Sequence, residues 1–499
     1  MKRKLLLFSI ALLLCLMTAT SWAAPFAGGS GTPGEPWIIA TPAQLDAVRD
    51  YPSAHFKLNN DIDLTAYLVK GGAGYAKWVN QGWEPIGDWL DMDRQFSGGF
   101  DGDGRKITGL WINRPSSNNV GLFGVTSNDT IKNLGVEIAD AGVIFRGRSG
   151  GLVGEKYGGS IENCYVTGNI SGTGAYIGGL VGDIDGGSIR NSHVTGNIGG
   201  TGSNKGGLVG RASGASIENC YATGNVSGNM SNMGGLVGLS NPGSSIENSH
   251  ATGNVIGDYG VGGLVGGGGG RIKNSHATGN IRGNNGGGFG GLVGSLSSTG
   301  IIENSYAAGD VIGDYCIGGL VGMSSSGGII KNSYATGNVD YVTGSANAGG
   351  AVGGLVGSHS SSGSIENCYA TSNVRGTKGV GGLVGSNSFG ASINNCYAAG
   401  NVSGNTYLGA LAGNNDSGTI ANCYRYESLT VNGAVVPTSD TDSVSNRKHG
   451  DTVSQTQLTT QETYSTTTSW QYTPAGPWHW DSRGFPKLNP GTENWPWPW

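Results

Sequence analysis

The chain has 499 residues, a net charge of −5 and only 13% charged residues. It therefore lacks the basic surface that nucleic-acid binding requires, and we exclude a nucleic-acid partner. Its length would allow two or three ordinary domains. The 96 glycines and a strict internal repeat instead predict one elongated repeat array.

Residues 1–23 have the features of a secretory signal peptide. They combine a basic start at residues 2–4, an apolar run over residues 5–17 and small residues at positions 21 and 23. The apolar run is too short for a comfortable membrane span, and no later stretch is apolar enough for one. We expect cleavage after about Ala23 and a secreted or cell-surface protein without a membrane span.

Residues 24–115 show no repeat and are predicted to form an N-terminal cap. A short helix is expected from Thr41, where a capping box and a proline mark its start, and strands are expected at 56–64 and 107–112. A solenoid without such a cap would expose its first strand edge and its open core. The acidic segment Asp101–Gly104 is interpreted as a turn, with calcium binding as the lesser alternative.

The segment 116–426 is built from repeats. Gly-Gly-Leu-Val-Gly occupies residues 150–154, recurs intact eight times, and ends in a degenerate copy at 409–413. Its leucines are spaced by 28 residues except for one step of 35. They are Leu152, Leu180, Leu208, Leu236, Leu264, Leu292, Leu320, Leu355, Leu383 and Leu411. The extra residues of the long step, near 341–350, are expected to bulge from a loop without interrupting the array.

Each repeat also contains a second recurring run, which is represented by residues 160–170. Both runs are short, β-branched and bounded by Gly, Ser and Asn, which is typical of strands joined by turns. A unit of 28 residues is too short for a propeller blade, and one leucine per unit is too few for a leucine-rich repeat. We predict an all-β, parallel β-helix of about ten 28-residue coils, closed by caps at both ends.

The direction of the side chains follows from an odd spacing. Ile161 and Ile170 are nine residues apart, so uninterrupted alternation cannot bury both. A break at Asn163 resolves this, because asparagine tolerates the left-handed region. The break points Cys164, Val166 and Ile170 inward, and Tyr165, Thr167 and Asn169 outward. At the Glu162 position, acidic and basic residues alternate between most neighbouring coils, which predicts ion pairs along the stack.

The sequence does not decide two properties: whether cysteines of the Cys/Ser column form a disulfide, and whether the Val153 column is exposed. Five of the six cysteines that follow the signal segment occupy the inward Cys/Ser column, which favours buried small residues over disulfides. A bond among Cys368, Cys396 and Cys423 remains open, although stacked parallel side chains have poor disulfide geometry. The Val153 column lies either on an exposed stripe or at a buried corner.

The outward face presents parallel rows of Tyr or His, of Thr and of Asn. Such an array is able to bind a repetitive ligand such as a glycan, although strand propensity alone also explains Tyr and Thr at exposed positions. An ice-binding role is a minor alternative, because bulky tyrosines disturb a flat lattice match. The candidate binding residues are Tyr165, Thr167, Asn169, Tyr221, Thr223, Asn225, His250, Thr252, Asn254, Tyr334, Thr336 and Asn338.

No catalytic residue, metal site or cofactor is predicted. A carbohydrate-active β-helix enzyme is the second hypothesis, but it needs carboxylates clustered a few ångströms apart. The repeats supply only single-file Glu alternating with Lys or Arg, and the denser acidic groups lie in the cap. The histidines at 193, 250 and 276 share the tyrosine column, so we expect them to stack with it.

Residues 427–499 lose the repeat, becoming rich in Ser and Thr and then in Trp. The simplest interpretation is a C-terminal cap that seals the last coil. The aromatic residues also allow a sugar-stacking platform. They are Trp470, Tyr472, Trp478, Trp480, Phe485, Trp495, Trp497 and Trp499.

Together, Gly-Gly-Leu-Val-Gly at 150–154 and its partner run at 160–170 resemble the GLUG-motif repeats of bacterial secreted and surface proteins. These repeats also occur beside IgA-specific metallopeptidase domains. The resemblance implies a right-handed β-solenoid and a role in adhesion or surface interaction. It does not imply proteolysis, because the chain has no His-Glu-x-x-His motif. We therefore expect a non-catalytic protein whose partners are glycans or surface and matrix proteins.

Overall fold

The computed structural model describes residues 25–297, 299–342, 349–437, 448–467, 470, 472, 478–481 and 485–488. The signal-like residues 1–23, the core of the long-step insertion and the last three tryptophans lie outside these. The protein is all-β, with 49% strand and 8% helix, and it forms a parallel β-solenoid of about 12 turns. The predicted fold class is confirmed.

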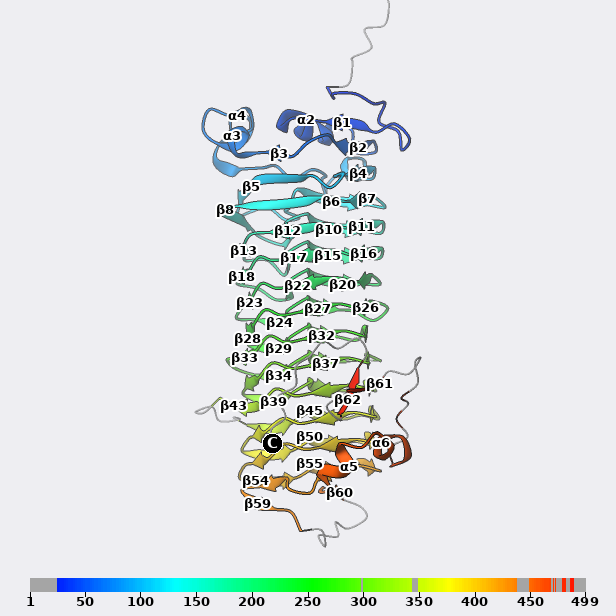
Figure 1. Ribbon diagram of the computed structural model, residues 1–499. Helices are drawn as coiled ribbons and strands as arrows, with labels where there is room; N and C mark the ends of the chain where they lie inside the picture. Colours follow the sequence, from blue (N-terminus) through cyan, green and yellow to red (C-terminus); the bar gives the residue numbers. More distant parts are fainter. Residues whose placement is uncertain are drawn as a thin grey trace, which may run out of the picture.

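Successive coils stack along one axis, so that each strand pairs in parallel with the same strand of the next coil (Figure 1). One complete coil consists of β14 (Tyr176–Gly178), β15 (Val181–Asp185), β16 (Ser188–Arg190), β17 (His193–Val194) and β18 (Ile198–Gly200). We name the sheets by these strands: β16 lies in sheet A, β17 and β18 in sheet B, β15 in sheet C and β14 in sheet D.

The repeat leucines lie one strand apart, as a 28-residue coil requires. The Leu180 N–H donates to Leu208 O at 2.9 Å, and the Leu208 N–H donates to Leu236 O at 2.9 Å. The stack also continues past the long step: β44 (Gly350–Gly353) pairs in parallel with the coils before and after it.

The number of coils exceeds the expected ten because the first ones lack the motif. β1 (Trp37–Ile39), β2 (His55–Leu58) and β4 (Gly99–Asp101) already pair in parallel and lead into β7 (Thr130–Lys132) of sheet A. The segment interpreted as a cap therefore contributes solenoid strands of its own. Repeat counting missed them because their spacing and sequence are irregular.

An asparagine turns the chain from sheet A into sheet B in each coil from Asn133 to Asn422. Asn163 has a φ of 54°, and the equivalent asparagines have φ between 48° and 55°, a region that asparagine visits more readily than most residues. They are Asn133, Asn191, Asn219, Asn248, Asn274, Asn304, Asn332, Asn367, Asn395 and Asn422. The predicted break is confirmed, since Cys164, Val166 and Ile170 are all buried after it.

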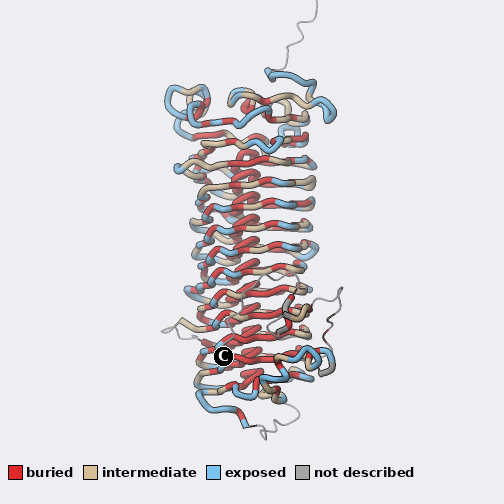
Figure 2. The backbone as a smooth tube through the Cα atoms, in the orientation of Figure 1, coloured by how far each residue is buried: buried red, intermediate tan, exposed pale blue. Residues whose placement is uncertain are grey.

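The Gly-Gly-Leu-Val-Gly motif forms a tight corner between sheets D and C. A Cβ on Gly179 would lie 2.2 Å from Gly207 O, and one on Gly182 would lie 2.4 Å from Ser149 N. Only glycine allows the backbones to approach this closely. Leu180 and Val181 between them are fully buried, so the valine column lies at a buried corner. Figure 2 shows the resulting buried strip in each coil.

The inward Cys/Ser column supports the backbone. Ser192 Oγ accepts a hydrogen bond from the Cys164 N–H at 3.1 Å and donates one to Arg190 O at 2.8 Å. The six described cysteines are all buried free thiols, which answers the open question about Cys368, Cys396 and Cys423. Burial raises the pKa of the Cys164 thiol to about 12, so this thiol is unreactive.

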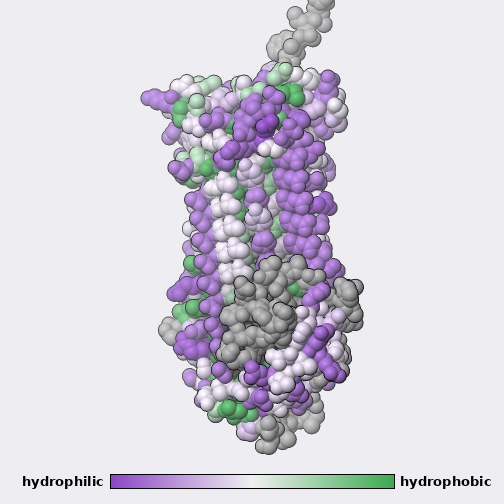
Figure 3. Space-filling view, viewed as in Figure 1, coloured by the Kyte–Doolittle hydropathy of each residue, from purple (hydrophilic) through white to green (hydrophobic). Residues whose placement is uncertain are grey.

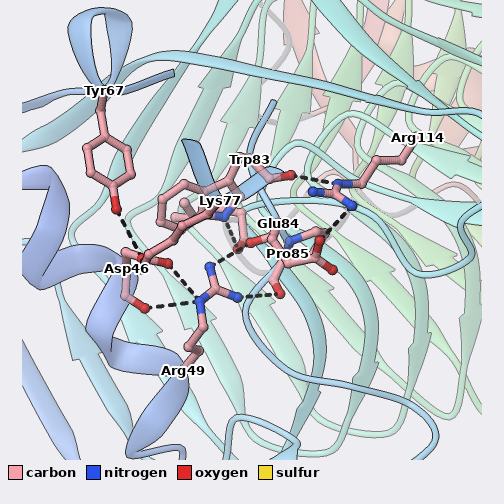
Figure 4. Close-up of polar contacts among 9 residues, drawn as sticks. Asp46, Arg49, Tyr67, Lys77, Trp83, Glu84, Pro85 and Arg114 are labelled. Atoms are coloured by element: carbon pink, nitrogen blue, oxygen red, sulfur yellow. Dashed lines mark hydrogen bonds and ion pairs between the residues drawn. The ribbon is translucent and has the colours of Figure 1, made fainter. Parts of the chain in front are cut away.

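The N-terminal end contains α2 (Pro42–Ala47), β3 (Ile62–Asp63), α3 (Thr65–Leu68), α4 (Ala73–Trp78) and β5 (Lys106–Arg114). Thr41 caps α2, as predicted, by accepting the Gln44 N–H. Figure 4 shows the network that ties these elements together. Arg49 Nε donates to Asp46 Oδ1 at 2.7 Å, and Tyr67 Oη donates to Asp46 Oδ2 at 3.0 Å.

Asp46 is buried at the centre of this network. Burial by itself would raise the pKa of its carboxyl, but hydrogen bonds and charges from Lys77 and Arg49 outweigh that effect and lower it. Asp101 in the neighbouring acidic segment accepts the Asp103 N–H at 2.9 Å, which fits the predicted turn.

The C-terminal segment does more than cover the last coil. β60 (Asp451–Val453) pairs in parallel with β57 (Tyr424–Tyr426) and so extends sheet B. After it, α5 (Gln455–Leu458), α6 (Gln461–Thr467), β61 (Trp478–Asp481) and β62 (Phe485–Leu488) lie beside the lower coils (Figure 1). The expected end cap thus continues as a covering on the side of the solenoid.

Among the described residues, no helix has both the length and the apolar character needed to cross a membrane.

Candidate binding surfaces of the solenoid

Aromatic rings form an unbroken stack along the outside of sheet B. Neighbouring ring centroids lie 4.6–5.4 Å apart and neighbouring planes differ by at most 15°. The rings, which we call the aromatic ladder, are those of Tyr165, His193, Tyr221, His250, His276, Tyr306, Tyr334, Tyr369 and Tyr397. Because each ring covers the face of the next, a ligand meets ring edges and polar tips. The ladder therefore has no free ring face on which a sugar can stack.

The three histidines of the ladder are held neutral by burial. Desolvation between the neighbouring rings lowers the pKa of His193 and His250. For His276, desolvation and then the charge of His250 lower the pKa to about 4. At neutral pH the ladder is therefore an uncharged column, as stacking requires.

The C-terminal segment covers the lower half of the ladder. Tyr334 and Tyr369 have no exposed surface, and their rings lie 6.4 and 5.8 Å from the ring of Trp478. Trp470 stacks on Trp478 at 4.4 Å and donates its indole N–H to Asn395 O. Both tryptophans are buried, so they do not offer the sugar-stacking platform that the sequence allowed.

Of the predicted binding residues, Tyr334 is thus covered and the upper coils remain open. Tyr165, Tyr221 and His250 are partly exposed. In the threonine row, Thr223 and Thr252 are exposed, whereas Thr167 and Thr336 are half-buried. Figure 3 shows hydrophilic residues aligned in rows over the upper coils.

The asparagine row has a structural role that the sequence did not reveal. Asn169 Oδ1 accepts the backbone N–H of Asn197 at 3.0 Å, and Asn225 Oδ1 accepts that of Asn254 at 2.9 Å. The same bond recurs in other coils, and in one of them the carboxylate of Asp310 accepts the backbone N–H of Asn338 at 2.8 Å. Where this bond forms, one lone pair of the side-chain oxygen is already used within the stack.

Glu155 and Asp183 share Arg148 Nε at 3.3 and 2.9 Å, but both carboxylates are buried and ion-paired, unlike the accessible pair that a hydrolase or lyase requires. Glu162, Arg190 and Glu218 form the expected alternating ion pairs on sheet A, at 3.9 and 3.4 Å. At the N-terminal end, Glu84 and Asp88 line a groove, but Glu84 is paired with Arg114 at 2.6 Å. In the part of the chain that the structure describes, no three His, Cys, Asp or Glu side chains are placed to hold a metal ion.

A second surface, on sheet D, was missed by sequence reasoning. Three tyrosines there are exposed by 44–54%: Tyr259, Tyr315 and Tyr407. Tyr315 and Tyr407 line a groove of about 510 Å³ that extends over the neighbouring strands of sheet C. A usable signal was present, because Tyr259 and Tyr315 both follow Gly-Asp directly before a repeat motif.

The GLUG motif matches seven segments of the chain, which confirms the expected resemblance. The matched residues are 146–171, 201–227, 231–256, 257–282, 313–340, 348–375 and 376–403. The matches fall within the predicted repeat segment.

Two relatives share part of this sequence. One, named "Putative Gly-rich membrane protein", comes from Evansella cellulosilytica and is 45% identical over 143 residues, or 27% of this chain. The other, Halomucin from Haloquadratum walsbyi, is 34% identical over 151 residues, or 29% of this chain. The matches cover only 15% and 2% of these relatives' own lengths, and neither name denotes an enzyme.

Among solved structures, a "putative immunoglobulin A1 protease" from Bacteroides ovatus is 18% identical to this chain. The similarity covers 93% of this chain and 95% of that one, with a TM-score of 0.30.

Proposed function

Starting from a chain built of GLUG-motif repeats, we propose that it is a non-catalytic secreted or cell-surface protein that binds glycans or matrix proteins through sheet B. The observation that carries this proposal is the open upper half of that face. There, the exposed Thr223 and Thr252 follow Tyr221 and His250, whose ring edges are partly exposed. The regular strand spacing of about 4.8 Å presents these groups as a repeating array.

The predicted signal peptide of residues 1–23 supports a location outside the cell, and the name of the Gly-rich membrane protein supports an association with the cell surface. An extended solenoid also suits a surface role, because it displays one long face without needing a closed pocket. Its rows offer hydroxyl groups and neutral ring edges, which are suited to hydrogen bonding with sugar hydroxyls or peptide groups.

The test is a glycan and matrix-protein array probed with the mature chain and with the double variant Tyr221→Ala/Thr223→Arg. We expect the double variant to bind at least about tenfold more weakly, a loss of about 1.4 kcal/mol. Ser216→Arg, on sheet A of the same repeat, is the control for added charge and is expected to bind normally.

Unchanged binding by the double variant would show that the ligand does not bind at the open upper half of sheet B. Release of reducing sugars from acidic polysaccharides by the purified chain would contradict a non-catalytic role and support the enzyme alternative.

A further inference from the structure

The groove on sheet D has the geometry of a binding site for an extended chain. One side of the groove is formed by successive coils of sheet D. Their paired residues are Tyr315, Gly350, Lys378 and Thr406, and Tyr407 directly follows the last of these. On the other side, Ser358, Ser386 and Asn414 are paired one coil apart in sheet C. Polar side chains thus recur at each strand spacing of about 4.8 Å, which is close to the length of one pyranose unit.

Tyr407 adopts a backbone conformation that tyrosine does not favour. Its φ is 54°, whereas the same column of sheet D holds asparagine or glycine in several other coils, at Asn204, Asn232, Gly260 and Gly379. The left-handed region is disfavoured for a bulky residue. The same column also holds Cys316 and Ala351, with φ of 51° and 53°, and at position 407 it places an aromatic ring at the end of the groove.

The ring of Tyr407 is held in place by two cations. Lys378 Nζ lies 5.7 Å and Lys448 Nζ lies 5.8 Å from its centroid, within the range of a cation–π contact. Tyr407 remains 54% exposed and Tyr315 44% exposed. Neither ring belongs to the continuous stack of the aromatic ladder, and the two lysines lie against Tyr407 alone of the pair.

The lining of the groove carries one charge of each sign, and Lys448 beside Tyr407 adds a second cation at its end. Lys378 and Asp416 are the only ionisable lining groups apart from the tyrosines among the described residues, and they have opposite signs. Asp416 would repel a polyanion and Lys378 would repel a polycation, whereas a neutral chain would be repelled by neither. Hydroxyl and amide groups are the remaining polar lining, and they suit ligands that both donate and accept hydrogen bonds.

We infer that this groove binds an extended neutral glycan, with sugar rings packed against Tyr315 and Tyr407 and their hydroxyls bonded to Ser358, Ser386 and Asn414. Aromatic rings supply apolar area together with a polar tip, which is the combination that a sugar ring requires. The inference rests on the proposed glycan-binding function but assigns it a site on a different sheet.

The test is affinity gel electrophoresis of the mature chain in gels containing hydroxyethyl cellulose, xylan or polygalacturonate. The chain is expected to be retarded by a neutral polymer and less by polygalacturonate. Tyr315→Ala and Tyr407→Asn are each expected to raise the dissociation constant at least about fivefold. Asparagine is chosen at position 407 because it occupies this column elsewhere, so the fold should persist, as circular dichroism will show.

Tyr259→Ala is the matched control. Tyr259 is an equally exposed tyrosine of sheet D outside the lining of the groove, so this variant is expected to be retarded normally. The sheet B double variant Tyr221→Ala/Thr223→Arg separates the two proposals. If it loses retardation and the groove variants keep it, the groove inference is wrong and the proposed function stands. Absence of retardation of the wild-type chain by both neutral polymers would also overturn the groove inference, while the array still tests the open half of sheet B.

Discussion

Asparagine performs two separate tasks in each coil. At the Asn163 position its backbone adopts the left-handed conformation, and its side chain bonds to the asparagine of the preceding coil: the Asn304 amide donates to Asn274 Oδ1 at 3.1 Å. At the Asn169 position its side-chain oxygen receives a backbone N–H from the next coil. Both tasks join neighbouring coils, so single asparagine substitutions are expected to act on the stack as a whole.

Asn248 provides a test of the first task. Its φ is 51°, and its Oδ1 accepts the Asn274 amide at 3.2 Å. Asn248→Ala should lower the free energy of unfolding by about 1–2 kcal/mol, because alanine disfavours the left-handed region. Asn248→Gly keeps the conformation available and should lose less than half as much. Urea unfolding measures both, and an equal loss in the two variants would contradict the backbone explanation.

His276 predicts a pH dependence of stability. Its pKa is about 4 in the folded chain and about 6.5 when unfolded, so the unfolded state binds more protons between these values. The contribution of the neutral histidine is therefore complete above pH 6.5 and is lost as the pH falls towards 4. His276→Tyr, which places in this column the residue found at Tyr306, should reduce the acid-induced loss by on the order of 1–3 kcal/mol.

The measurement is urea unfolding of both chains at pH 7 and pH 4.5. The reverse substitution Tyr306→His is the control and should increase acid sensitivity. Parallel pH profiles for the wild type and His276→Tyr would show that the ladder does not disfavour the charged imidazole.

At the scale of elements, the C-terminal segment decides which part of sheet B is accessible. Its described residues place Trp470 and Trp478 against Tyr369, and Tyr369 Oη donates to Pro486 O at 3.3 Å. Tyr464 of α6 packs against Tyr397 with ring centroids 5.7 Å apart. These contacts bury the lower rings of the aromatic ladder, whereas its upper rings stay partly exposed.

Trp470→Ala is expected to loosen this covering while the coils stay folded. Removing a buried tryptophan costs about 3–5 kcal/mol of packing, and here the lost contacts are those of the segment with the ladder. Proteolysis between β60 and β61 should become faster, and the pKa of Tyr397, which burial raises, should fall in a spectrophotometric titration. Trp89→Ala, at a 55% exposed tryptophan, is the control and should change neither quantity.

At the scale of the whole molecule, each coil contacts mainly its neighbours, so coils should be removable in units of one period. Deleting residues 207–234 removes 28 residues and joins Gly206 to Gly235, in a region where Gly206 already pairs with Gly234. Stability in such arrays is close to a sum over repeats and their interfaces. We therefore expect the shortened chain to keep its β-rich circular dichroism spectrum and cooperative thermal unfolding.

Deleting residues 207–220 removes half a period and is the matched comparison. It would place apolar residues of one coil opposite turn residues of the next, because register fixes which side chains face the interior. A half-period deletion that unfolds no more readily than the full-period deletion would contradict the one-coil-per-repeat architecture.

The architecture of the coil can be predicted from the amino-acid sequence alone, because its period, its glycines and its Cys/Ser column each reflect contacts that the repeats share. The burial of Ile161, Cys164 and Ile170 and the left-handed turn at Asn163 follow from that periodicity alone. The expected ladder of stacked tyrosines and histidines also follows from it. Contacts that recur in the coils require the same residue types at each repeat, so they can be predicted from the sequence pattern.

The contacts that are not periodic could be found only in the folded protein. The early strands β1, β2 and β4 pair without sharing the motif, and Lys156 is buried in an ion pair with Asp129 at 2.5 Å. The covering of Tyr334 by Trp478 brings together residues far apart in the chain. Such contacts occur once, between unlike segments, so no repeated pattern in the sequence records them.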